Sequence, residues 1–138
     1  MVAMLKPGNT YYELYYHVVF ATKLRLPMLT IQKVKCIREI TKTKANEIGF
    51  LLHILNGHVD HIHALITVPP ALPLARVIKH IKGVSSRQID ELYWHEGYWV
   101  QGVEKPNVAA VASYIEKQQE HHARSTREEW EPYHLPGI

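Results

Sequence analysis

The sequence predicts an α+β fold in which helices pack against a four-stranded antiparallel sheet. Segments rich in aromatic and β-branched residues alternate with segments whose apolar residues recur at helical spacing. Two of the strand-like segments are separated by so short a turn that they are expected to pair antiparallel. The resulting order is strand, helix, strand, strand, helix, strand, helix, which favours one sheet with helices packed on it.

The first predicted strand covers Tyr11–Thr22, where aromatic and β-branched residues are frequent. A loop over Lys23–Pro27 follows. The first helix is expected to begin after Thr30, a good N-cap residue, and to end at Gly49. Its apolar residues repeat every three or four positions: Ile31, Val34, Ile37, Thr41, Ala45 and Ile48.

The second and third strands are predicted over Phe50–Asn56 and His61–Val68, joined by a turn through Gly57 and Asp60. Three prolines then end the third strand: Pro69, Pro70 and Pro73. The second helix is indicated by an apolar stripe at helical spacing: Leu74, Val77, Ile78 and Ile81.

Gly83 is expected to weaken the second helix, and Ser85-Ser86 to cap another short helix that runs through Leu92. The fourth strand is predicted over Tyr98–Val100. Pro106-Asn107 is expected to open a final helix that reaches about His121. The polar, proline-containing residues 122–138 are interpreted as a C-terminal tail behind a single domain with its core at about 11–121.

This order of elements predicts a ferredoxin-like plan, which many unrelated functions share, so the fold alone decides little. The 138 residues suffice for one core, and 46% hydrophobic with 21% charged residues fits a folded, soluble protein. Because the sequence contains neither a bilayer-spanning apolar run nor a secretory leader, we expect a cytoplasmic protein without membrane association. Cys36 is the only cysteine, which excludes an internal disulfide.

The net charge of +3 is unevenly distributed along the chain. Residues 1–89 contain 12 Lys and Arg against 4 Asp and Glu, whereas residues 90–138 contain 4 against 9. The basic part is consistent with a polyanionic partner such as nucleic acid. A solvated basic surface without a partner is an equally good interpretation. The sequence has no glycine-rich phosphate loop, so no nucleotide cofactor is expected.

His61 and His63 are separated by one apolar residue within a predicted strand. Because side chains alternate along a strand, both imidazoles point to one face, and Ile62 points to the other. Two imidazoles on one rigid face are a natural beginning of a metal site, although a His-x-His pair by itself is a weak motif. His58 is a possible third ligand whose direction the sequence leaves open.

Tyr114 and Gln118 are four residues apart in the final predicted helix and therefore share a face. A tyrosine beside a metal suggests a nucleophile that cuts and rejoins a nucleic-acid strand. Gln118 could supply an amide oxygen to the same metal. Each residue alone is more simply read as an ordinary helix residue, packed or solvated.

Five segments now resemble a known family in content and order. They are Tyr15–Lys23, Val59–His63, Ile81–Arg87, Trp94–Val100 and Tyr114–Gln118. Their order resembles that of the single-tyrosine HUH transposases, the small TnpA-type enzymes of bacterial and archaeal insertion sequences (the IS200/IS605 group). The resemblance covers roughly residues 11–121, which makes it far more specific than either short motif.

This resemblance implies that His61 and His63 are the paired histidines, Tyr114 the nucleophile and Gln118 the residue that completes the metal site. It implies a homodimer that cuts single-stranded DNA carrying hairpins through a 5′-phosphotyrosine intermediate. It also implies Mg²⁺ or Mn²⁺ as the cofactor, and imidazole ligands suit manganese better than magnesium.

Six basic residues are candidates for contacts to the DNA backbone. They are Lys23 and Arg25 after the first strand, and Arg76, Lys79, Lys82 and Arg87 along the second helix. For each of them, ordinary surface charge is an equally good interpretation. Tyr98 and Trp99 could stack on unpaired bases but more simply fill the core or a dimer contact.

Alternatives to an active transposase remain open. One is a domesticated relative that nicks repetitive palindromic DNA. Another is a hairpin-binding protein without catalysis, which would need neither Tyr114 nor a metal. A replication initiator is a weaker option, because 138 residues leave no room for a helicase.

Overall fold

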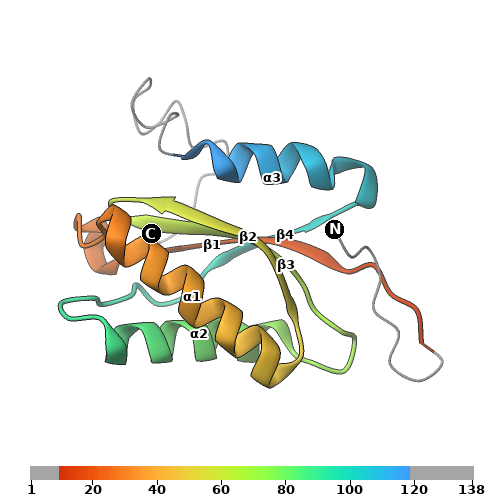
Figure 1. Cartoon of the computed structure of the whole chain (residues 1–138), viewed down its shortest axis with the longest axis horizontal. Helices are drawn as coiled ribbons and strands as arrows, with labels where there is room; N and C mark the ends of the chain where they lie inside the picture. The colour runs from red at the N-terminus through yellow and green to blue at the C-terminus, as the bar shows by residue number, and fades with distance from the viewer. Residues whose placement is uncertain (1–9, 119–138) are drawn as a thin grey trace.

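A four-stranded antiparallel sheet in the order β2-β3-β1-β4 forms the centre of the computed structural model, which describes residues 10–118 (Figure 1). The two inner strands, β1 and β3, pair with each other and with one edge strand each. The elements in chain order are β1 Tyr15–Ala21, a 3₁₀ turn Lys23–Arg25, α1 Ile31–Ile48, β2 Leu51–His58, β3 His61–Thr67, α2 Leu74–Gln88, β4 Trp99–Val103, a 3₁₀ turn Lys105–Asn107 and α3 Val108–Glu116. This α+β, ferredoxin-like arrangement confirms the predicted fold class.

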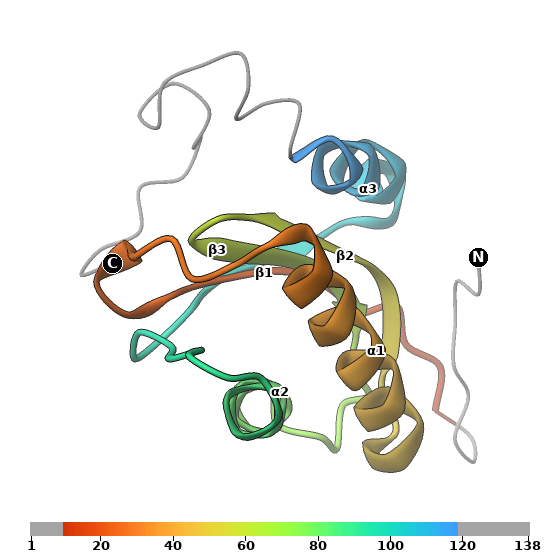
Figure 2. The same cartoon turned by 60° about the vertical axis from the view of Figure 1, so that its left-hand side comes forward.

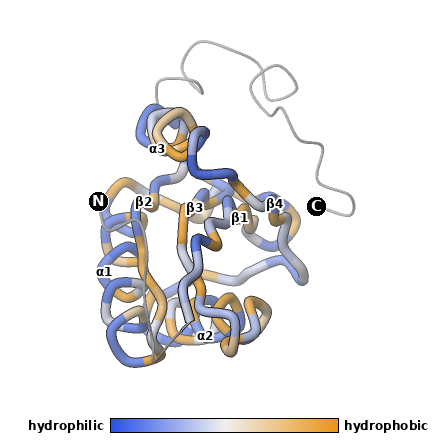
Figure 3. Tube along the Cα trace, turned by 90° about the vertical axis from the view of Figure 1, so that its right-hand side faces the viewer, coloured by the Kyte–Doolittle hydropathy of each residue, from blue (hydrophilic) through white to orange (hydrophobic). Residues whose placement is uncertain are grey.

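The two faces of the sheet are covered by different helices. Figure 2 shows α1 and α2 on one face and α3 alone on the other. In Figure 3 each helix carries both hydrophobic and hydrophilic residues, as expected for helices that bury only one side. None of the helices in the described part of the chain is long and apolar enough to cross a membrane.

The main core lies between the sheet and the pair α1 and α2. Val18, Phe20 and Ile62 point into it, because Phe20 lies opposite Ile62 and strand side chains alternate. These three side chains are fully buried. Their sequence neighbours Val19 and His63, which also lie opposite each other, therefore point to the α3 face.

A second, smaller core holds α3 on its face of the sheet. Tyr15 on β1, Leu65 on β3 and Val108 and Ile115 on α3 are buried together. Val108 and Ile115 are seven residues apart, two helical turns, so they anchor both ends of the helix on the same side.

Both predicted ends of α1 are confirmed. The Thr30 side chain accepts a hydrogen bond from the Lys33 backbone N–H at 3.1 Å, as an N-cap does. Gly49 takes a left-handed conformation with φ of 98°, which a residue with a side chain rarely adopts. The chain can therefore turn sharply from α1 into β2.

The predicted break in the second helix is wrong. Ser85 and Ser86 do not cap a new helix but lie inside a continuous α2, where the Ser85 hydroxyl donates to the Ile81 carbonyl at 2.7 Å. Ser85 is buried and also accepts a hydrogen bond from the Trp94 indole at 2.9 Å. Tertiary packing of this turn outweighs the weak helix propensity of Gly83.

Several predicted strand boundaries shift. β1 begins only at Tyr15, and β2 runs on to His58. β4 covers Trp99–Val103 rather than Tyr98–Val100, because its register with β1 extends to the pair Tyr15–Val103. The predicted extension of the final helix to about His121 and the predicted tail at 122–138 lie outside the described residues.

Candidate active site

The paired histidines lie at the beginning of β3 and face α3, as their spacing predicts. His61 is 0% and His63 2% exposed. Their ring centroids are 5.1 Å apart. Because β3 is an inner strand with neighbours on both sides, the two imidazoles are held on a rigid surface.

Asp60 fixes the orientation of His61. Its carboxylate lies 2.7 Å from the Nδ1 atom of His61 and 3.3 Å from the Nε atom of Arg25. Burial favours the protonated acid and would raise the pKa of Asp60, but its hydrogen bonds to His61 and Arg25 and the electrostatic attraction of these two partners outweigh this effect and hold the pKa well below its usual value. A charged Asp60 accepts a hydrogen bond from Nδ1–H, which directs the Nε2 lone pair of His61 away from Asp60.

His17 on β1 is a further member of the site that sequence reasoning missed. Its Nε2 atom is 2.8 Å from the Nδ1 atom of His63, and the two rings are stacked with centroids 5.0 Å apart. His17 is 2% exposed, and this burial lowers its pKa to about 4. His17 is therefore neutral at pH 7 and can accept a hydrogen bond from His63. A titratable residue in an otherwise apolar inner strand was the only signal for it.

Tyr114 lies over these histidines from α3. Its ring centroid is 5.7 Å from that of His63 and 6.2 Å from that of His17, with both ring pairs close to perpendicular. The end of α3 is tied to β2 by a hydrogen bond of 3.0 Å from the Asn56 amide to the Glu116 carbonyl. The predicted nucleophile and the histidine pair are therefore brought together within one chain.

Gln118 is fully buried one helical turn beyond Tyr114. Its amide nitrogen donates to the Tyr114 carbonyl at 3.3 Å. Its amide oxygen is buried and has no hydrogen-bond partner among residues 10–118. A buried oxygen without a partner is energetically costly, so it is a candidate ligand atom.

His58, the possible third ligand, lies directly opposite His61 at the end of the β2–β3 hairpin. It is only partly buried. Within the described residues, however, no three His, Cys, Asp or Glu side chains form a group that could hold a metal ion. A metal at the histidine pair would therefore need a ligand of another type, and an amide oxygen is one.

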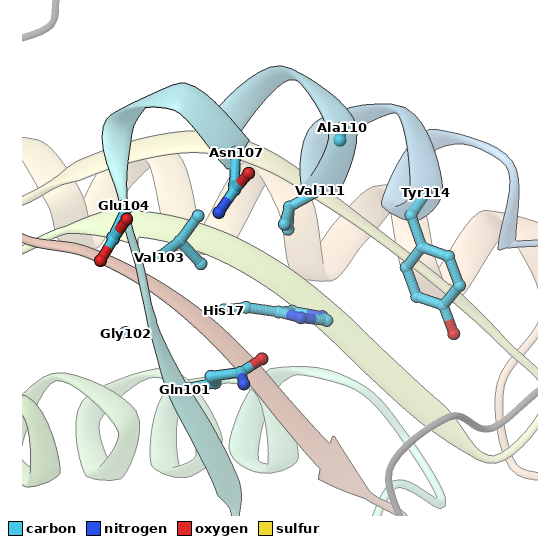
Figure 4. A pocket seen from close by; sticks show the side chains of 9 residues that line it. All are labelled: His17, Gln101, Gly102, Val103, Glu104, Asn107, Ala110, Val111 and Tyr114. Carbon is cyan, nitrogen blue, oxygen red and sulfur yellow. The ribbon is translucent and has the colours of Figure 1, made fainter.

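A groove with a volume of about 620 Å³ lies beside the tyrosine, between β4 and α3. Figure 4 shows Asn107 of the preceding 3₁₀ turn, and Val111 and Tyr114 of α3, above His17 and Gln101 of the sheet. The groove therefore leads directly to the candidate nucleophile.

The family of the chain follows from comparison with known proteins. The model of the family described as "Transposase IS200 like" matches residues 10–118, most of the chain. The chain belongs to the IS200-like transposase family. This confirms the resemblance that the five ordered segments indicate.

This IS200-like transposase is similar along most of its length to two named transposases. It is 25% identical over 127 residues to the ISDra2 transposase TnpA of Deinococcus radiodurans, covering 83% of this chain and 91% of the relative. It is 27% identical over 125 residues to the transposase for insertion sequence element IS200 of Salmonella typhimurium, covering 82% of both.

Solved structures with the same fold include two transposases. A crystal structure of a transposase candidate from Deinococcus radiodurans has a TM-score of 0.63 at 26% identity, covering 83% of this chain and 98% of that one. A REP-associated tyrosine transposase bound to a REP hairpin has a TM-score of 0.64 at 16% identity, covering 88% of this chain and 76% of that one. The second likeness shows the shared fold alone.

The six basic residues of the IS200-like transposase lie in different surroundings. Arg76, Lys79 and Arg87 are exposed on α2. Arg25 is only 9% exposed at its side chain and is occupied by the ion pair with Asp60. The ion pair with Asp60 therefore accounts for Arg25 without any contact to DNA.

Lys23 and Lys82 line a common cleft beside the loop that leads into β4. Lys23 is exposed, whereas the Lys82 amine is half-buried and donates to the backbone carbonyls of His95 and Gly97. Burial lowers the pKa of Lys82, although the charge of nearby Glu96 acts in the opposite direction. Lys82 thus holds this loop against α2.

Proposed function

We propose that this IS200-like transposase cuts and rejoins single-stranded DNA through a covalent bond between Tyr114 and a 5′ phosphate, with the help of a divalent metal. The observation that supports it most directly is the ring of Tyr114 packed against His63 of the buried histidine pair. Family membership supports DNA strand cleavage and transfer as the general activity.

The metal would be held by His61, His63 and Gln118. Asp60 and His17 engage the Nδ1 atoms of the two histidines, which makes Nε2 the ligand atom of each. The buried amide oxygen of Gln118 completes the set. Two imidazoles and one amide oxygen suit Mn²⁺ better than Mg²⁺, and either ion would polarise the scissile phosphate and offset its developing charge.

Tyr114 performs the bond exchange in this proposal. A tyrosine phenol is a poor nucleophile until its proton is removed. The Tyr114 oxygen loses this proton and bonds to phosphorus, while the bond from phosphorus to the 3′ oxygen breaks and that oxygen takes up a proton. Because one phosphate ester replaces another, a second DNA 3′-hydroxyl can reverse the step on a new strand without ATP.

We propose single-stranded DNA with hairpins as the substrate and a homodimer as the working form. The REP-associated transposase with the same fold is bound to a hairpin, which is consistent with this substrate. The exposed basic residues of α2 provide a surface for the phosphates of a hairpin stem.

The test is a denaturing gel of the protein with labelled single-stranded DNA from the genomic flanks of its gene, in the presence of Mn²⁺. We expect a protein–DNA adduct that is absent with Tyr114→Phe and in chelator. Tyr93→Phe removes the same hydroxyl from an exposed tyrosine on the loop before β4 and should leave the adduct intact. His61→Ala should abolish it.

Two outcomes would contradict the proposal. Hairpin binding without any adduct would indicate a binding protein or an inactivated relative. An adduct that His61→Ala forms normally in chelator would refute the role of the metal while leaving the tyrosine in place.

A further inference from the structure

The groove between β4 and α3 has a composition that the cleavage chemistry does not explain. Its walls include the apolar side chains of Val103 and Val111, and the rings of His17 and Tyr114 lie at one end. Three polar side chains complete it, Gln101, Glu104 and Asn107. All three are exposed, and none makes a hydrogen bond to another residue within the described part of the chain.

The charge of the groove argues against a phosphate as its occupant. Among the described residues that line it there is no Lys or Arg, and Glu104 contributes a negative charge. A DNA phosphate would be repelled there. A nucleobase is neutral and flat, has an apolar face and carries hydrogen-bonding groups at its edge, so its chemistry matches apolar walls with amide and carboxylate groups.

We infer that this groove holds one unpaired base next to the scissile phosphate and reads its edge. The inference rests on the proposed function, because the groove ends at Tyr114, where the phosphate would react. The nucleotide adjacent to this phosphate in the strand then extends into the groove between β4 and α3. The volume of about 620 Å³ is within the range of small-ligand sites and leaves room for a nucleotide with its water.

The side chains also predict which bases are accepted. The Glu104 carboxylate only accepts hydrogen bonds, so it favours a base with an amino group, and the amides of Gln101 and Asn107 can pair with adenine. Thymine has no amino group and offers only its ring N3–H, between two carbonyl oxygens that repel a carboxylate, so Glu104 disfavours it relative to the bases with an amino group. The groove therefore selects adenine, cytosine or guanine against thymine at one position beside the cut.

The decisive experiment uses a pool of single-stranded oligonucleotides that carry a stem-loop from the genomic flanks, with randomised bases on both sides of the stem. Covalent adducts of the full chain are isolated, and their DNA is sequenced. With wild type we expect thymine to be depleted at one position flanking the cut. Glu104→Gln keeps the size of the side chain but can donate to thymine, and should relax this depletion by about 5- to 100-fold.

Glu39→Gln is the matched control, since it makes the same chemical change on α1, on the opposite face of the sheet. It should keep the wild-type base profile. If Glu104→Gln gives the wild-type profile at every flanking position, the inference is wrong although the cleavage function stands.

A second measurement separates the inference from the proposed function. Side-chain amide signals of Gln101 and Asn107 are followed by NMR in full-length Tyr114→Phe while unlabelled oligonucleotides of adenine or thymine are added. We expect both signals to shift with adenine and to shift far less with thymine. Unmoved signals in the presence of bound DNA would overturn the inference, and this result does not depend on whether the wild type forms an adduct.

Discussion

Single residues beside the histidine pair determine which nitrogen each imidazole can offer. Asp60 engages Nδ1 of His61, and His17 engages Nδ1 of His63. Such outer partners fix the tautomer and the ring orientation of a metal-binding histidine. Because His17 is neutral, unlike Asp60, it orients His63 without adding a charge to the site.

His17→Ala should therefore weaken Mn²⁺ binding by about 10- to 100-fold, the usual cost of losing such a partner. The reason is that His63 loses the acceptor that keeps its proton on Nδ1. Isothermal titration of the metal into wild type and variant measures the effect directly. His80 is an exposed histidine on α2, so the His80→Ala variant should bind Mn²⁺ as the wild type does. Equal Mn²⁺ affinities of the His17→Ala and His80→Ala variants would show that His17 does not support the metal site.

The sequence predicts the residues of the site better than their partners. His61 and His63 follow from strand alternation, and Tyr114 with Gln118 from helical spacing, because these are local regularities. The contacts of His17 with His63 and of Arg25 with Asp60 join residues 46 and 35 positions apart. They depend on how β1 and its following loop lie against β3, which no local pattern specifies. Arg25 was for this reason predicted at a DNA contact, although its side chain is taken up by Asp60.

Among the elements, the β2–β3 hairpin carries the histidine pair and depends on one close approach. A Cβ atom added to Gly57 would lie 2.5 Å from the carbonyl oxygen of His61 and 2.8 Å from the side chain of Ile62. The first of these contacts involves backbone, which cannot move aside without disturbing the strand pairing. Gly57 thus permits the tight packing at the beginning of β3.

Gly57→Ala should lower the free energy of unfolding by about 2 kcal/mol or more, as overpacking of a tight site does. Gly102→Ala is the control within β4, because a Cβ there has no atom within 4 Å. It should change stability by no more than about 0.5 kcal/mol. Urea denaturation of both variants tests this, and equal stabilities would show that the hairpin accommodates a side chain.

Element types could be predicted from the sequence, whereas their ends depended on tertiary contacts. α1 was predicted at both ends because Thr30 and Gly49 act locally. α2 was predicted to break near Gly83, yet packing of Ser85 against Trp94 keeps it continuous. β4 was predicted too short because its last residues pair with β1 without forming an apolar pattern of their own.

For the whole molecule, the sheet separates the exposed basic residues of α2 from the candidate active site. α2 packs on one face, whereas α3, which carries Tyr114, packs on the other (Figure 1). A hairpin bound on α2 would contact Arg76 and Lys79 without touching the catalytic residues. Binding of the hairpin and cleavage of the strand should then respond to different mutations.

Replacing both Arg76 and Lys79 with Ala should weaken hairpin binding about equally for all stem sequences, since phosphate contacts carry no sequence information. The slope of log affinity against log salt concentration should fall by about 1 for each residue that contacts a phosphate. Fluorescence anisotropy at several salt concentrations measures both quantities. The double variant Lys35→Ala and Lys42→Ala on α1 removes the same charge, and an equal loss there would point to unspecific attraction instead.

The separate cores on the two faces of the sheet also matter for protein engineering. Most buried apolar residues lie between the sheet and α1 and α2, away from the histidines. Repacking that layer, or replacing Gly83 with Ala, whose Cβ would meet only the end of the Arg87 side chain at 3.2 Å, can raise thermal tolerance. Such changes leave the α3 face untouched, so this transposase can be made more heat-resistant without the loss of activity that stabilising an active site often causes.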